Sequence, residues 1–185
     1  MNEGSDILEG QLRECYGRVV YSHKTHEKCA DILLRHLKTI NWLQIILSAI
    51  ASTGFITAIW GEEKIGAIIG SIVSISLLIL NAYTKDYDHG ELAQKHRQAA
   101  ADLWLIREKY LSLLTDLRME AKSLEAIGKE RDLLLQELHA VYSGAPSTNN
   151  KAYRAAQHAL QNLEDMTFSD DEVDAFLPAE LKRKK

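Results

Sequence analysis

Three side chains near the N-terminus have the types and spacing that could bind a metal ion. His23, His26 and Cys29 follow one another at intervals of three residues, and imidazole nitrogen and thiolate sulfur are ligands that zinc prefers. On a helix, however, each such interval turns the side chain by about 60° around the axis, so the three cannot easily face one ion. We therefore interpret them as incidental residues of an amphipathic helix, and we expect neither a metal site nor a cofactor.

Polar side chains inside two otherwise apolar runs indicate a different chemistry, the passage of ions or water. Four of them would project within about 80° of one another on a helix in the first run: Asn41, Gln44, Ser48 and Ser52. A second set shares a similar arc in the second run: Gly66, Gly70, Ser74 and Asn81. Polar side chains are costly against lipid, so both sets should face protein or water.

Two interpretations of these polar sets stay open. In the first, they are packing contacts within one helical hairpin or between subunits, and Gly66, Gly70 and Ser74 form a small-residue ridge that lets helices approach closely. In the second, several hairpins assemble into a ring and the polar side chains of the first run line a water-filled pore. A single pair of helices cannot enclose a channel, so the second interpretation requires oligomerisation.

The sequence carries no recognisable enzyme signature. It contains no phosphate-binding glycine loop, no G-x-S-x-G and no H-E-x-x-H, and no combination of acid, base and nucleophile stands out. We therefore expect no catalytic residues, and an enzyme acting on nucleotides or lipids is disfavoured. A formal net charge of only −4 argues against a general nucleic-acid binder.

The elements that position the polar sets are predicted to be transmembrane helices. Residues 39–61 and 65–84 contain no charged residue. At a rise of about 1.5 Å per residue, each run reaches roughly 30 Å, the thickness of the hydrocarbon core of a bilayer. The first run follows a long charged stretch and precedes no small-residue cleavage site, so it is not a secretory signal.

Aromatic residues predict where the two spans meet the membrane surfaces. Trp42 and Trp60 are separated by about 27 Å along a helix, and Tyr83 lies at the end of the second span. These rings favour the headgroup region, so we expect all three residues to act as interface anchors. The connection, residues 62–64, is too short for an external domain and forces an antiparallel hairpin.

Basic residues predict the orientation of the hairpin. Those near the span ends, apart from the connection, are Lys24, Lys28, Arg35, Lys38, Lys85, Lys95 and Arg97. The connection carries Lys64 alone. Because basic residues stay on the cytoplasmic side, we predict a multi-pass protein of the inner membrane with both termini in the cytoplasm.

The remaining segments are predicted to be cytoplasmic helices. Residues 1–38 alternate apolar and charged positions as an amphipathic helix does, and residues 85–142 form a long helical region. Asp88, followed by Glu91, could cap its start, or the second span could continue through this point. Gly128 marks a break or a kink in the region. The region carries a heptad-like apolar stripe: Leu92, His96, Ala99, Leu103, Ile106, Tyr110, Leu113 and Leu117.

The stripe needs a partner, which is either the N-terminal helix or a second subunit. Residues 143–149 read as a linker, and residues 150–185 as C-terminal helices with a capping box at Ser169 and Glu172 and a basic tail. The predicted fold is all-α: a two-helix transmembrane hairpin with long cytoplasmic helices that form a coiled-coil-like bundle.

Two stretches of the sequence carry a family resemblance. Residues 15–31 (CYGRVVYSHKTHEKCAD) and residues 92–104 (LAQKHRQAAADLW), on either side of two spans with a minimal connection, resemble the SLATT proteins, the SMODS and SLOG-associating two-transmembrane effectors of bacteria. The resemblance covers roughly residues 8–142 and leaves the C-terminal part outside. It implies a membrane effector of a bacterial conflict system, such as defence against phage, and no catalytic residues.

Two functions follow as hypotheses. In the first, the protein oligomerises and, on a signal from a nucleotide second messenger or a sensor protein, forms a pore that depolarises the membrane. In the second, it is a non-conducting membrane scaffold that recruits a cytoplasmic partner. Toxicity and loss of potential on expression without the partner would distinguish the pore from the scaffold.

Overall fold

The described part of the protein is helical throughout. The structure, a computed structural model, describes residues 3–60, 65–163 and 165–183, with the side chains of 57–60 outside the description. Within these ranges there is no strand, so the all-α prediction is confirmed. The two prolines, Pro146 and Pro178, both lie between helices, where a residue that lacks an N–H and fixes its backbone disturbs no helix.

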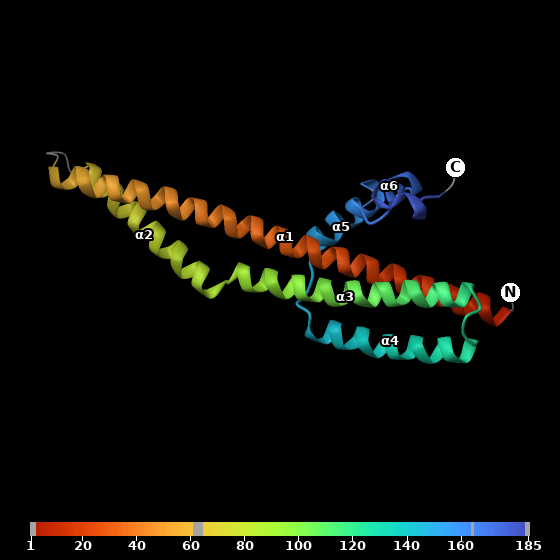
Figure 1. Cartoon of the computed structure of the whole chain (residues 1–185). Coiled ribbons are helices and arrows are strands. Elements are labelled where there is room, and N and C mark those ends of the chain that lie inside the picture. The colour runs from red at the N-terminus through yellow and green to blue at the C-terminus, as the bar shows by residue number, and fades with distance from the viewer. Residues whose placement is uncertain (1–2, 61–64, 164, 184–185) are drawn as a thin grey trace.

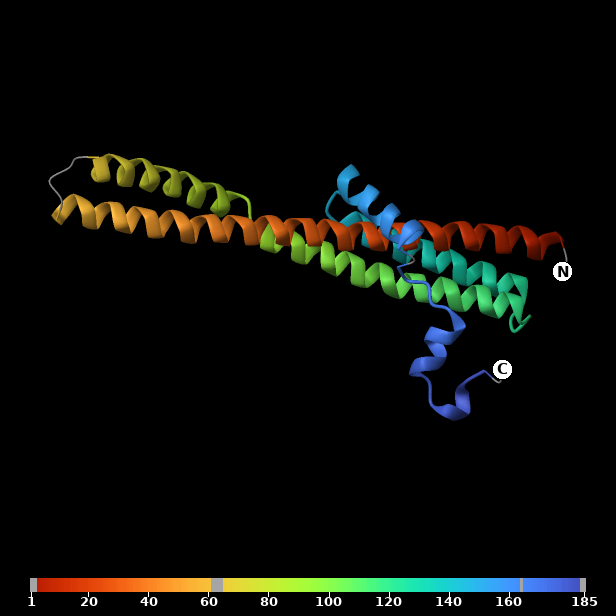
Figure 2. The same cartoon turned by 90° about the horizontal axis from the view of Figure 1, so that it is seen from above.

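One helix, α1 (Glu3–Trp60), runs the whole length of the molecule (Figure 1). Its 58 residues correspond to a rod of roughly 87 Å, which joins the predicted amphipathic segment to the first span without interruption. The second span, α2 (Ile65–Asp86), lies antiparallel beside the far end of α1, as both views show (Figures 1 and 2). The predicted connection, 62–64, lies outside the described residues.

A short break separates the second span from α3 (His89–Arg118). The backbone N–H of Glu91 donates to the Asp88 carboxylate at 2.8 Å, so the predicted cap of this helix is confirmed. From there α3 packs along α1 back towards the N-terminus. The helix α4 (Leu124–Gly144) then returns antiparallel to α3.

The predicted break at Gly128 is wrong, because Gly128 lies inside α4. The chain reverses earlier, between Met119 and Ser123. Glu120 adopts a left-handed backbone with φ 52°, and the Ser123 hydroxyl accepts from the N–H of Ala126 at 3.2 Å, which starts α4. The intrinsic cost of a helical glycine, about 1 kcal/mol, is outweighed here by the burial of neighbouring Ile127 against α1 and α3.

The core of the bundle contains most of the predicted heptad stripe. Every residue of the stripe from His96 to Leu117 is buried. Leu92, the first residue of the predicted stripe, is exposed, and the neighbouring Ala93 is buried in its stead. These side chains meet Leu12 and Val19 of α1 together with Ile127 and Leu134 of α4. The stripe therefore has its partner within the same chain, in the N-terminal helix.

The C-terminal part begins with α5 (Asn150–Asn162), which packs on α1 through Ala152, Ala156 and Ala159. It is followed by α6 (Asp170–Phe176) and a short 3-10 helix, Ala179–Leu181. The capping box at Ser169 and Glu172 is present as predicted. The predicted linker, 143–149, is shorter in the structure, because α4 continues to Gly144 and α5 begins at Asn150.

Truncating a core leucine should destabilise the bundle strongly. Leu103 is fully buried, whereas Leu105 on the same helix is half exposed. We expect Leu103→Ala to lower the free energy of unfolding by about 2–5 kcal/mol, because it removes apolar contacts and leaves a cavity. Thermal and denaturant unfolding of the detergent-purified protein would measure this, with Leu105→Ala as the matched control. Equal stability of the two variants would contradict the assigned core.

Candidate functional site

The far end of the molecule is an apolar hairpin whose surface the protein itself leaves uncovered. Two helices are long and apolar enough to cross a membrane. The first covers the predicted span 39–61 as far as Trp60, and the second contains the predicted span 65–84. Their large apolar side chains point outwards; Ile45 is 60% exposed and Leu78 is 69% exposed. A helix in the core of a soluble protein would bury such residues, so this surface fits contact with lipid.

The two spans cross at a pair of glycines. A Cβ atom placed on Gly54 would lie only 3.0 Å from the Cα of Gly70 and 3.1 Å from the carbonyl oxygen of Gly66. The structure therefore places Gly66 and Gly70 at the helix contact, whereas Ser74 is exposed. Gly54, the opposing residue on α1, was not singled out from the sequence, because it is an isolated glycine without a spacing motif.

Of the predicted polar residues, the structure brings two together. The Gln44 side-chain amide donates to the amide oxygen of Asn81 at 2.8 Å, across the hairpin. In an environment without water, such a bond satisfies two groups that would otherwise be costly to bury. This contact corresponds to the packing interpretation for Gln44 and Asn81.

The other predicted polar residues stay apart on the outside of the hairpin. Asn41, Ser48, Ser52 and Ser74 are all exposed. The Ser52 hydroxyl donates to the carbonyl of Ser48 at 2.9 Å, one turn back on its own helix. Within the described residues, the side chains of Asn41, Ser48 and Ser74 have no hydrogen-bond partner, so one copy of the chain does not satisfy them.

Of the predicted interface anchors, Trp42 and Tyr83 lie at the end of the hairpin next to the helical bundle. Trp42 and Tyr83 are both exposed, and Tyr83 stacks on Tyr87 with the ring centroids 5.2 Å apart. The side chain of Trp60 lies outside the described residues. Exposed aromatic rings at this level fit the headgroup region.

His26 and Cys29 face different neighbours in the bundle. His26 turns towards α3, where its Nδ1 lies 2.9 Å from the Nδ1 of His96. The Cys29 sulfur instead faces Asn149, whose amide donates to it at 4.0 Å. In the described ranges no group of three potential metal ligands comes together. Burial raises the pKa of the Cys29 thiol, which disfavours the thiolate that a metal needs.

The contact of His26 with His96 was not predicted, since the two residues are distant in sequence. Burial, followed by the nearby His96 and His23, lowers the pKa of His26 to about 4, and burial also lowers the pKa of His96. One ring must donate and the other accept, so the bond requires that at least one ring stays neutral.

This pair should make the bundle sensitive to acid. Below about pH 6.5 an unfolded chain takes up protons on histidine, whereas folded His26 does so only near pH 4. The free energy of unfolding should therefore be level above about pH 6.5 and fall between pH 6.5 and 4, by about 3 kcal/mol from His26. Unfolding at a series of pH values would show this. His26→Leu should make this fall shallower, whereas His158→Ala, at an exposed position of α5, should leave it unchanged. The same fall in both variants would contradict the assignment.

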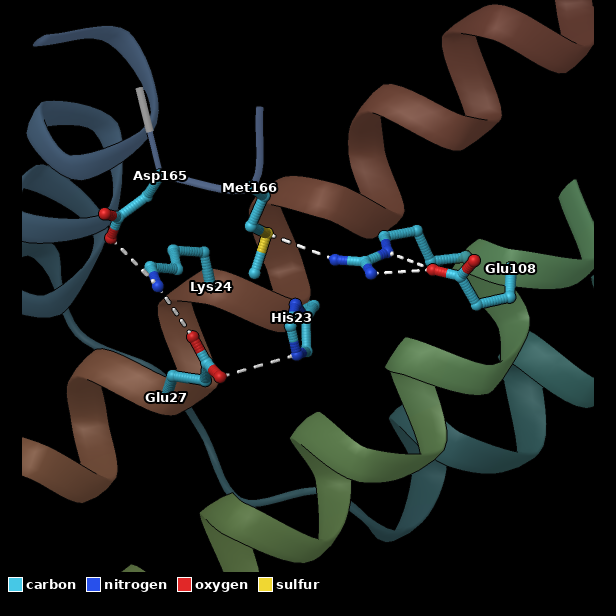
Figure 3. A network of polar contacts seen from close by, with 7 residues as sticks. His23, Lys24, Glu27, Glu108, Asp165 and Met166 are labelled. Atoms are coloured by element: carbon cyan, nitrogen blue, oxygen red, sulfur yellow. Dashed lines mark hydrogen bonds and ion pairs between the residues drawn. The ribbon is translucent and has the colours of Figure 1, made fainter. Parts of the chain in front are cut away.

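A second polar cluster fastens the segment after α5 to the bundle (Figure 3). The Lys24 ammonium of α1 lies 2.9 Å from Glu27 and 3.1 Å from Asp165. Burial alone would lower the pKa of Lys24, but its hydrogen bonds to both carboxylates raise it. Arg107 of α3 donates to the sulfur of Met166 at 3.2 Å and pairs with Glu108 at 2.6 Å. The segment therefore spans both helices.

Comparison with known proteins agrees with this architecture. The model of SMODS and SLOG-associating 2TM effector domain family 4 matches residues 8–172. The match extends past the predicted limit at residue 142, so α5 and the start of α6 lie within the family region. No curated protein and no solved structure matches the chain. The long apolar hairpin, the helical bundle at its base and this match over most of the sequence together show that the chain belongs to the SMODS and SLOG-associating 2TM effector domain family 4 and is a membrane effector of that kind.

Proposed function

We propose that the protein is the membrane effector of a bacterial conflict system, such as defence against phage, that oligomerises and opens a depolarising pore on receiving a signal. It lies in the inner membrane with both termini in the cytoplasm, because the basic residues flank the spans on the bundle side. It acts as a binding and conducting protein, without catalysis.

The observation that carries this proposal is the set of polar side chains that one hairpin leaves uncovered. Asn41, Ser48 and Ser74 lie on the outer surface of the two spans, among exposed isoleucines and leucines. Hydroxyl and amide groups are costly against hydrocarbon. Association of several copies would cover them or place them against water in a central pore.

The continuous helix α1 supports a mechanical link between signal and pore. Its first half packs against α3, α4 and α5, and its second half is the first span. A helix transmits a rotation or tilt along its length when nothing interrupts its hydrogen bonds. A change in the packing of the bundle would therefore move the span that carries Gln44, Ser48 and Ser52.

Opening would also change the contact that now closes the hairpin. The bond between Gln44 and Asn81 holds the spans together in the structure. If α1 rotates so that Gln44 faces a water-filled pore, water replaces Asn81 as its partner at little cost. The bond therefore favours the closed arrangement without preventing the open one.

Loss of membrane potential in cells that express the protein tests the proposal. We expect induction of the wild-type chain to depolarise the cells, and Gln44→Leu combined with Ser48→Leu to abolish depolarisation while membrane insertion persists. Ile45→Leu, at an exposed position between them, is the matched control and should depolarise normally. A wild-type chain that inserts, oligomerises and leaves the potential intact under all inducing conditions would instead identify a scaffold.

A further inference from the structure

A cavity of about 750 Å³ lies between α1, α3 and the segment after α5. It is within the range of 300–1,000 Å³ that small-molecule sites occupy. Arg97, Trp104 and Arg107 line it from α3, at spacings of seven and three residues that place them on one face of the helix. His23 and Asp31 line it from α1, opposite them.

The two arginines of this cavity have unused capacity to bind an anion. Arg97 is exposed and makes no ion pair within the described residues. Arg107 is largely buried, with 15% of its side chain exposed, and one of its nitrogens donates only to the sulfur of Met166. A thioether is a weak acceptor, so a phosphate oxygen would be a much stronger partner for the same guanidinium.

The histidine in the wall is an unsatisfied polar group. His23 is only 5% exposed, and its Nδ1 has no hydrogen-bond partner. Its other ring nitrogen lies 3.7 Å from Glu27. Burial lowers the pKa of His23, so the ring is neutral at pH 7 and one of its nitrogens can accept. A buried acceptor without a partner is costly, so a hydrogen-bond donor on a bound ligand would stabilise this position.

Met166 lines the same cavity and lies where a ligand would have to bind to reach His23. Its side chain points towards the His23 ring in Figure 3, and its sulfur accepts a hydrogen bond from Arg107. Its φ of 72° is in the left-handed region, which is unfavourable for a residue other than glycine. A ligand that offers better partners to His23 and Arg107 could therefore displace Met166 at low cost.

Two aromatic side chains in the cavity offer faces on which a planar ring can stack. Trp104 and Phe168 both line the cavity, and they are 49% and 70% exposed. Exposed aromatic faces stack well on planar ring systems. Asp31 has no side-chain partner within the described residues and can accept from a ring N–H or a sugar hydroxyl.

We propose that this cavity binds a nucleotide, with the base stacked on Trp104, the phosphate on Arg97 and Arg107, and Asp31 accepting from the base or sugar. Each feature alone is common on protein surfaces; together they match the planar ring, the hydroxyl groups and the anion of one class of ligand. The inference rests on the proposed function, whose signal it assigns to a chemical class and a site.

Binding to the detergent-purified full chain tests the site without reference to conduction. We would titrate AMP, GMP and a 3′,5′-linked dinucleotide, with adenosine and inorganic phosphate as probes of each half alone. At least one nucleotide should raise the unfolding temperature and bind at least tenfold more tightly than either half. Inorganic phosphate binding as tightly as every nucleotide, or no binding of any probe up to millimolar concentration, would overturn the proposal.

Substitutions of residues that line the cavity test whether the nucleotide binds there. Arg97→Ala and Trp104→Leu should each weaken the binding of the nucleotide about tenfold or more, whereas Arg118→Ala, at an exposed position outside the cavity on the same helix, should not. Undiminished affinity in both cavity variants would overturn the assignment. A chain that binds nucleotide without depolarising cells would refute the pore alone, and one that depolarises cells but binds no nucleotide would refute the site alone.

Discussion

Replacing Gly54 with isoleucine is expected to abolish depolarisation. A Cβ atom at this position would lie 3.0 Å from the Cα of Gly70 and 3.1 Å from the oxygen of Gly66. Both neighbours are backbone atoms, which cannot rotate away, so the spans must separate. Separation would remove the packing on which helix association in lipid depends. The membrane potential of induced cells, followed with a fluorescent dye, would measure the loss.

Matched substitutions distinguish this contact from a general effect of bulk. Ala49→Ile adds a large side chain at an exposed position of the same helix and should leave depolarisation intact. The two glycines should also differ, because a Cβ on Gly70 would approach its nearest neighbours only to 3.5 Å, an ordinary contact. We therefore expect Gly54→Ala to impair the protein and Gly70→Ala to be tolerated. Equal tolerance of both would contradict the assigned crossing.

A proline between the bundle and the first span is expected to disconnect the signal from the pore. Lys38 is exposed and lies in the interior of α1. In Lys38→Pro, the ring removes a backbone hydrogen bond and clashes with the preceding turn, at a cost of roughly 3 kcal/mol or more. The helix should kink there. Depolarisation should fall at least tenfold, while bundle and hairpin remain folded.

The charge of Lys38 requires its own control. Lys38→Ala removes the ammonium group and keeps the helix, so it should depolarise cells nearly as the wild type does. Protease protection and membrane fractionation would verify that the proline variant inserts normally. Full activity of Lys38→Pro would show that the continuity of α1 does not transmit the signal.

Local sequence patterns predicted the elements whose packing depends on regular spacing. The two uncharged runs became helices with outward apolar side chains, and the stripe from His96 to Leu117 became the core face of α3. The caps at Asp88 and Ser169 were also predictable. In each case a residue type and a fixed spacing determine the structure within a few turns of helix.

Features that depend on distant contacts were missed or misplaced. The reversal at residues 119–123 contains neither glycine nor proline, so its composition is typical of a helix. The break was therefore predicted at Gly128, the nearest glycine. Gly54, the contact of His26 with His96, and the cavity beside Trp104 each depend on which helices become neighbours. A single sequence does not specify that register, because many antiparallel pairings bury the same apolar stripes.

Cysteine labelling at the tip of the hairpin tests the central claim, that α1 and α2 cross the membrane from a cytoplasmic bundle. In a background with Cys15→Ser and Cys29→Ala, Glu63→Cys should react with a membrane-impermeant maleimide in intact spheroplasts. Lys182→Cys, beyond α6, should react only after the membrane is permeabilised. Labelling of Glu63→Cys only after permeabilisation would place the tip in the cytoplasm and contradict the account.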